Sequence, residues 1–213
     1  MYVSVGCKRL FVRHPLKRGD MENYLAYLVR SFAEQKKYLK IVMGLFVFGI
    51  IIGVLEHETV SGYIKDAVSN LFGRFEDLRG IELFVRIFLN NIMAAFTATA
   101  SGILFGILPL LSALINGLII GTVLTNLVQL TELTSFQAVL SLIPHGIFEI
   151  PAFLLSLALG VALGTWPFRQ EKSAFLAGVF NAAAKAYFKI VIPFLIIAAA
   201  IETIGIELLR RAG

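Results

Sequence analysis

The residues best suited to do chemistry in this chain lie in the string Pro-His-Gly-Ile-Phe-Glu-Ile-Pro at positions 144–151. His145 and Glu149 are four residues apart, so on a helix their side chains share one face. A histidine and a carboxylate in this arrangement could relay a proton, contact a substrate or supply two ligands to a metal ion. The apolar stretch around them, from about Phe136 to Gly164, carries no other charge. An ionisable group in such a stretch marks a candidate functional site.

The polar residues expected to share the core with this pair are asparagines, namely Asn90, Asn91, Asn116 and Asn126. Asparagine is a poor zinc ligand, and a metal ion needs more ligands than His145 and Glu149 provide. We therefore predict no metal site and no cofactor. Two interpretations stay open. In the functional one, the first three asparagines line a polar path with the pair. In the structural one, Glu149 pairs with His145, with Arg86 or with asparagine donors, and the asparagines join helices through hydrogen bonds.

Several enzyme signatures are missing from the sequence. It contains no His-Glu-x-x-His run, no Gly-x-Ser-x-Gly elbow and no phosphate-binding loop of the Gly-x4-Gly-Lys type. Glu149 is the only carboxylate expected inside the bundle, so a paired-carboxylate site is not predicted. We expect a protein that is not an enzyme, and an intramembrane enzyme stays as a third alternative.

The composition is that of a polytopic membrane protein. Of 213 residues, 58% are hydrophobic and 15% are charged, whereas a soluble domain carries about 25% charged residues. The net charge of +5 lies beside the expected spans, which indicates membrane topology and anionic lipid and argues against nucleic acid. Cys7 is the only cysteine, so no disulfide can form within the chain. The first long apolar run starts near Ile41, too late for an ordinary cleavable signal peptide.

These residues must be positioned by membrane helices. We predict an all-α bundle of about five spans, with amphipathic helices at the membrane surfaces and a fourth span broken by proline. A basic cytoplasmic tail and amphipathic helix occupy 1–40, a membrane domain 41–208 and a short tail 209–213. The spans are expected at about 41–55, 83–105, 111–130, 136–165 and 187–208, with an interfacial helix at 60–78.

Two breaks in the helices follow from proline and glycine. The 48 residues 83–130 would make a helix of about 72 Å, more than two bilayer cores, so a reversal is expected near Gly106–Pro109. In the fourth span the residues that disturb the helix are Pro144, Gly146 and Pro151. A break at membrane depth is tolerated only inside protein or beside a wet cavity.

The charge pattern predicts a cytoplasmic N-terminus and a C-terminus outside. Thirteen Lys or Arg fall in the segments that this topology places inside, and five in those that it places outside, as the positive-inside rule requires. Tyr38, Trp166 and Tyr187 fall at the predicted inner boundaries, where aromatic rings are enriched.

Glycines recur at a spacing of four in four spans. The pairs are Gly49 and Gly53, Gly102 and Gly106, Gly117 and Gly121, and Gly160 and Gly164. Such pairs let helix backbones approach closely, so we expect a tight bundle. A homo-oligomeric interface is a further expectation, beside contacts with membrane lipids and with other membrane or cell-envelope proteins.

An ordered set of motifs resembles a known family. The motifs are Phe88-Leu-Asn-Asn91, Gly102-Ile-Leu-Phe-Gly106, Ile115-Asn-Gly117 with Gly121, and Pro144-His-Gly-Ile-Phe-Glu-Ile-Pro-Ala152. Over about residues 83–164 the chain resembles the stage II sporulation protein M family of integral membrane proteins. The resemblance implies a membrane component; in spore formers the founding member works with peptidoglycan-cleaving partners during engulfment. Family members also occur in organisms that do not sporulate, including archaea.

The leading expectation is therefore a non-enzymatic component that scaffolds or anchors a partner complex. The alternative is a small channel or transporter subunit that uses Asn90, Asn116, His145 and Glu149 as a polar path.

Overall fold

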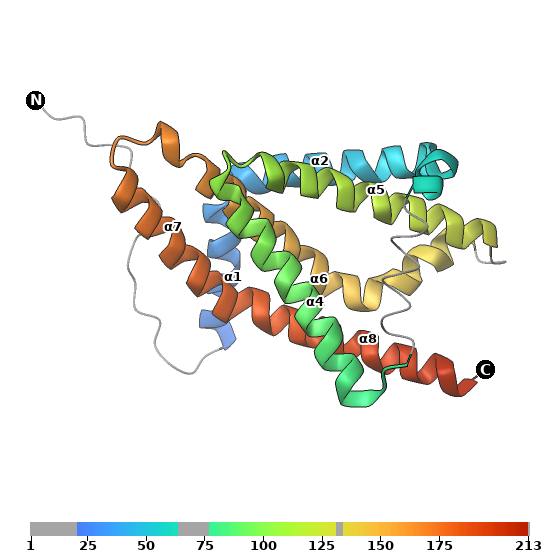
Figure 1. Cartoon of the computed structure of the whole chain (residues 1–213). Coiled ribbons are helices and arrows are strands. Elements are labelled where there is room, and N and C mark those ends of the chain that lie inside the picture. The colour runs from blue at the N-terminus through green and yellow to red at the C-terminus, as the bar shows by residue number, and fades with distance from the viewer. Residues whose placement is uncertain (1–20, 64–76, 131–133, 213) are drawn as a thin grey trace, which may run out of the picture.

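The computed structural model describes residues 21–63, 77–130 and 134–212, and all regular secondary structure in these ranges is helical (Figure 1). Five of the described helices are long and apolar enough to cross a membrane, as the sequence predicts. In chain order the elements are α1 (Met21–Glu34), α2 (Lys36–Leu55), α4 (Gly80–Ala100), η1 (Ser101–Ile103), α5 (Ile107–Leu130), α6 (Ser135–Gly164), η2 (Trp166–Phe168), α7 (Lys172–Ala186), η3 (Tyr187–Val191) and α8 (Ile192–Ala212). The predicted tail before residue 21 and most of the interfacial helix predicted at 60–78 lie outside the described residues, although 57–63 is helical.

The first span begins earlier than the composition indicates. The helix is interrupted at Gln35, where φ is −95° and ψ is 5°, and α2 then runs from Lys36. The lysines at its start belong to the helix, whose first turns already bury Leu39 and Val42. The short amphipathic helix α1 runs away from the start of α2 at a steep angle (Figure 1).

The reversal between the second and third spans lies at residues 104–106, just before the predicted position. Phe105 and Gly106 both adopt left-handed conformations, with φ of 58° and 72°. The Gly106 N–H donates to the Gly102 carbonyl at 2.8 Å, which closes the turn. Pro109 falls in the first turn of α5, where its missing N–H has no helical partner to lose.

Helix α6 is the centre of the bundle. Within the candidate span Gly146–Phe168, 67% of the helix is buried, whereas the other four candidate spans are 28–33% buried. The helix is continuous from Ser135 to Gly164 and bends near its middle (Figure 1). Pro144 and Pro151 therefore accompany a bend in the fourth span and do not divide it into two helices.

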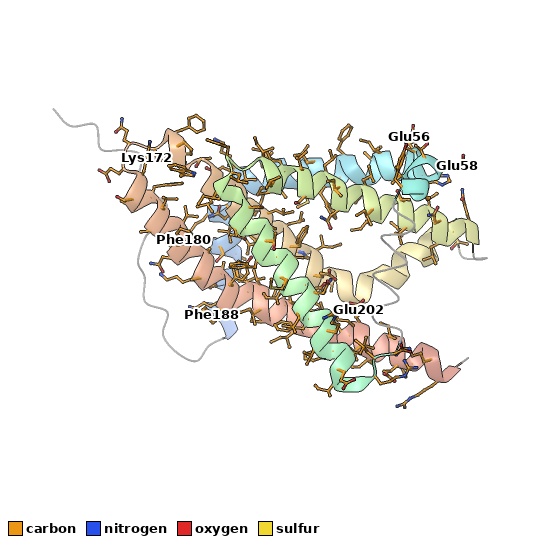
Figure 2. The ribbon with its side chains drawn as sticks, in the orientation of Figure 1. Glu56, Glu58, Lys172, Phe180, Phe188 and Glu202 are labelled. Atoms are coloured by element: carbon orange, nitrogen blue, oxygen red, sulfur yellow. The ribbon has the colours of Figure 1, made fainter. Side chains whose placement is uncertain are left out.

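The last helical segments form one continuous rod that changes direction where α7 passes into α8 (Figure 1). The sequence predicts a loop and helix over 166–186, followed by a span. In the structure α7, η3 and α8 follow one another without interruption from Lys172 to Ala212. The rod crosses α4, and Lys172 lies at the end of the molecule opposite to Glu56 and Glu58 (Figure 2). Charged residues thus lie at both ends of the apolar bundle.

Candidate functional site

Four of the predicted packing glycines form the contact between α2 and α5. A Cβ built on Gly49 would overlap the Leu114 carbonyl oxygen, and one on Gly117 would overlap the Phe46 carbonyl oxygen. Gly53 and Gly121 meet backbone atoms of the facing helix in the same way. Because the obstacles are backbone atoms, no side-chain rotation could make room for a methyl group. The two helices are held together along a seam that admits only glycine.

The other four glycines lie between α6 and the end of α4 with its following turn. A Cβ on Gly102 would overlap the backbone of Gly160, and a Cβ on Gly164 would overlap that of Gly106. The second seam fixes the reversal at residues 104–106 against the central helix. Both seams together define a bundle whose backbones are in direct contact.

The polar residues of α4 point in two directions. The side chains of Arg86 and Asn90 are exposed on the outside of the bundle. Asn91 is half-buried, and its Oδ1 accepts a hydrogen bond from Asn90 Nδ2 at 3.4 Å. Within the described part of the chain, Asn91 Nδ2 is buried and has no hydrogen-bond acceptor. The structure therefore places one asparagine on the outer surface and turns its neighbour inward.

Glu149 has a second carboxylate as its neighbour. It is half-buried on α6, and the Glu202 carboxyl group of α8 lies within electrostatic reach of it. Glu202 lies beside the bent part of α6 (Figure 2). The expectation that Glu149 is the only carboxylate inside the bundle is therefore wrong. The reason is visible in the sequence, since Glu202 falls within the predicted fifth span.

The two asparagines of α5 make separate hydrogen bonds in the described structure. Asn116 Nδ2 donates to the Ser112 carbonyl of its own helix at 2.8 Å. Asn126 Nδ2 donates to Ser61 Oγ at 2.7 Å, at another point of α5. The side chain of His145 lies outside the part of the chain that the structure describes. No group of three or more His, Cys, Asp or Glu side chains among the described residues could hold a metal ion.

A hydroxyl cluster links three helices at a π-helical turn. The Tyr187 hydroxyl, on η3, donates to the Ala95 carbonyl at 2.5 Å and lies 2.9 Å from Thr99 Oγ1. Thr99 Oγ1 also donates to the Ser156 carbonyl of α6 at 2.9 Å. Tyr187 is thus tied into the bundle, whereas the sequence predicts it at a membrane boundary. Since π turns in helices often occur at functional or strained positions, this turn is an element that helical periodicity alone does not reveal.

A second polar cluster, also missed by the sequence analysis, closes the end of the bundle near η2. Arg169 donates from Nη2 to Thr165 Oγ1 at 3.2 Å and to the Tyr38 hydroxyl at 3.4 Å. Its guanidinium carbon lies 4.6 Å from the ring centre of Phe175. Gln35 is 6% exposed, and in the described structure its Oε1 has no donor. The cluster joins the α1–α2 break to the segment before α7.

The fold and the positions of the charged residues identify the class of protein to which the chain belongs. An all-helical bundle of apolar, bilayer-length helices, with charges at its two ends, is a multi-pass integral membrane protein. A family model for stage II sporulation protein M matches residues 42–205, and the chain belongs to that family. The resemblance carried by the motifs in 83–164 is thereby confirmed and extended to most of the chain.

The comparison with curated proteins gives one distant relative. An uncharacterised protein of Methanocaldococcus jannaschii is 30% identical over 116 residues, which is 54% of this chain and 62% of the relative. The match thus spans less than two thirds of the archaeal protein. No solved structure matches the chain.

Proposed function

We propose that this chain is a non-enzymatic membrane scaffold that binds a helix of a partner membrane protein along the outward face of α4. The observation that carries the proposal is the exposure of Asn90 in the middle of an apolar span. Its Nδ2 makes a long hydrogen bond to Asn91 Oδ1, at 3.4 Å, and a polar group that is left without a partner in an apolar medium costs about 1–3 kcal/mol. A partner helix with a polar side chain at the same depth would remove that cost.

The surroundings of Asn90 fit a helix-binding surface. Arg86, Asn90, Met93 and Thr97 are all exposed and follow one another at helical spacing on α4. Phe96 is 58% exposed beside them. The amide of Asn90 and the hydroxyl of Thr97 are the kinds of polar group that form hydrogen bonds between membrane helices. The glycine seams support this role because they hold α4 rigidly against α6.

A photo-crosslinking amino acid at position 90 tests the proposal in native membranes. We expect a specific protein adduct at position 90, lost when Arg86 is replaced by Leu and Thr97 by Val. The matched control is a crosslinker at Phe188, which is 77% exposed on η3 and points away from the bundle (Figure 2). If the crosslinkers at positions 90 and 188 both label lipid alone, the proposal that α4 binds a partner helix is refuted.

We also propose that the N-terminus is cytoplasmic and the C-terminus outside, because the positive charge of 1–40 favours the inner side. Cys7 is the only cysteine and serves as a native label. A membrane-impermeant maleimide should modify Cys7 only after the cells are permeabilised. Labelling in intact cells would reverse the assigned topology.

A second candidate function is a small channel or transporter subunit. It is favoured by the interaction between the Glu149 and Glu202 carboxylates and by the buried, unbonded amide of Asn91. Acidic pairs inside membrane bundles mark ion or proton paths. In liposomes, Glu149→Gln and Glu202→Gln should each abolish a pH-dependent flux while the fold survives. A flux that is absent from the wild type, or unchanged in both variants, would remove this candidate.

A further inference from the structure

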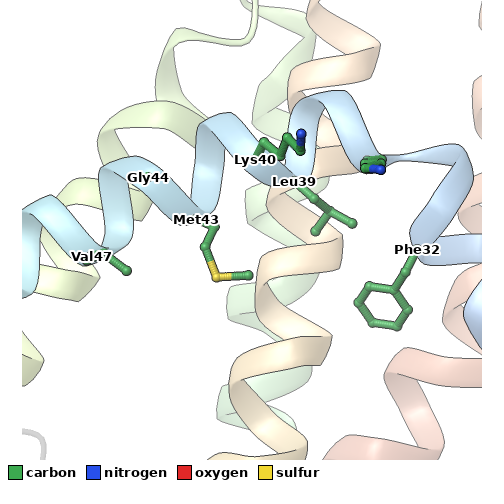
Figure 3. A pocket seen from close by; sticks show the side chains of 7 residues that line it. Phe32, Leu39, Lys40, Met43, Gly44 and Val47 are labelled. Atoms are coloured by element: carbon green, nitrogen blue, oxygen red, sulfur yellow. The ribbon is translucent and has the colours of Figure 1, made fainter.

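A groove lies on the outer side of α2, in the corner that α2 makes with α1. It has a volume of about 450 Å³ and is open on its outer side. Figure 3 shows Phe32, from α1, on the side of α2 towards which Leu39 and Met43 point. The groove is independent of the α4 face and of the polar residues between α4, α6 and α8.

The chemistry of the groove changes along its length. Lys36 and Lys40 line the end at the start of α2, one helical turn apart, and Met43 and Val47 line the other end. None of the described lining residues is acidic. From Lys36 to Val47 the helix rises about 16 Å, which is about half of a bilayer core of roughly 30 Å. The groove therefore has a cationic end and an apolar end separated by the thickness of one leaflet.

The floor of the groove is kept open by a glycine that packing does not require. A Cβ built on Gly44 meets no heavy atom within 4 Å, in contrast to Gly49 five residues further on. A larger side chain at 44 would be accommodated by the bundle and would project into the groove. The open space belongs to the surface of α2 and not to a contact between helices.

We propose that this groove binds one phospholipid with an anionic headgroup. The phosphate lies between Lys36 and Lys40, and one acyl chain lies along Leu39, Met43 and Val47 under the ring of Phe32. An amphiphile with a negative end matches both halves of the groove. The lysines are suited to this role because long cationic side chains reach headgroups from apolar helix surfaces.

Native mass spectrometry of the full chain in detergent tests the proposal, with phosphatidylglycerol and phosphatidylcholine as probes. The wild type should retain one phosphatidylglycerol in preference to phosphatidylcholine. Each lysine near an anionic surface contributes about fivefold, so Lys36→Gln with Lys40→Gln should lower the preference by about 25-fold. Lys37→Gln is the matched control, because Lys37 lies between the two and does not line the groove.

A second variant separates the apolar half from the headgroup end. Gly44→Leu should lower the retention of both lipids at least fivefold, while Gly205→Leu, which also faces open space on α8, should leave it unchanged. Equal binding of the two lipids by the wild type, or wild-type retention in Gly44→Leu, would overturn the proposal. So would a change from dimer to monomer in Gly44→Leu, because the groove would then hold a second copy of the chain.

Discussion

Replacing Gly49 by alanine should separate α2 from α5 and destabilise the bundle. In the structure a Cβ at this position would overlap the Leu114 carbonyl oxygen and would lie 2.9 Å from the Leu118 nitrogen. Non-bonded heavy atoms prefer about 3.5–4.0 Å, and both obstacles are backbone. The helices must therefore move apart by roughly 1 Å, which forfeits a quarter to a half of the dispersion energy of the atoms along the seam.

The loss of unfolding free energy in Gly49→Ala can be estimated by comparison with a second glycine of the same helix. Overpacking costs about 1–3 kcal/mol in well-packed cores, and the backbone contact places Gly49→Ala at the upper end. Alanine also favours a helix by about 1 kcal/mol over glycine. Gly44→Ala receives the same helical gain and meets no heavy atom within 4 Å. Because the gain cancels in the difference, Gly49→Ala should be about 2–3 kcal/mol less stable than Gly44→Ala.

The assay is unfolding by sodium dodecyl sulfate from mixed micelles, followed by circular dichroism and by the fluorescence of the single tryptophan, Trp166. A double-mutant cycle with Gly117→Ala adds a second readout. Since one separation of α2 from α5 relieves both clashes, the double variant should lose less than the sum of the two single losses. If the stabilities of Gly44→Ala and Gly49→Ala agree within about 0.5 kcal/mol, α2 and α5 are not in backbone contact at Gly49.

Three further outcomes can be measured with the same unfolding assay. Tyr187→Phe removes the bond to the Ala95 carbonyl and should cost about 1 kcal/mol; the control Tyr63→Phe, at a side chain that is 85% exposed, should cost nothing measurable, and equal losses would contradict the hydroxyl cluster. Gly106→Ala forces a methyl group onto a residue at φ 72° and should cost more than about 1 kcal/mol; a stabilised variant would show that the turn is not left-handed. Asn90→Leu should leave the free energy of unfolding within about 0.5 kcal/mol of the wild type, because its side chain is exposed; a large loss would place this amide in the core.

Elements that depend on local properties could be predicted from the sequence. The apolar content and the bilayer length give the number of spans, and Gly106 with Pro109 gives the reversal to within a few residues. The spacing of the glycines directs attention to positions such as Gly49 and Gly117, because a missing side chain is a local property. Their partners across each seam required the structure.

Elements that depend on distant parts of the chain could not be predicted. Tyr187 lies at the edge of an apolar run, and its hydroxyl partners are Ala95 and Thr99, about 90 residues earlier. No pattern in the sequence marks the π turn that aims this ring inward. Glu202 is different, since a carboxylate inside a predicted span is a signal that residue types alone supply.

The rod from Lys172 to Ala212 connects the two ends of the molecule. Its helices have 15, 5 and 21 residues, so the path along the bent rod is about 60 Å, twice the thickness of a bilayer core. Ile190 and Val191 are fully buried at the π turn, which keeps that turn from acting as a free joint. A displacement of α7 would therefore be passed to α8 through a turn that is packed inside the bundle.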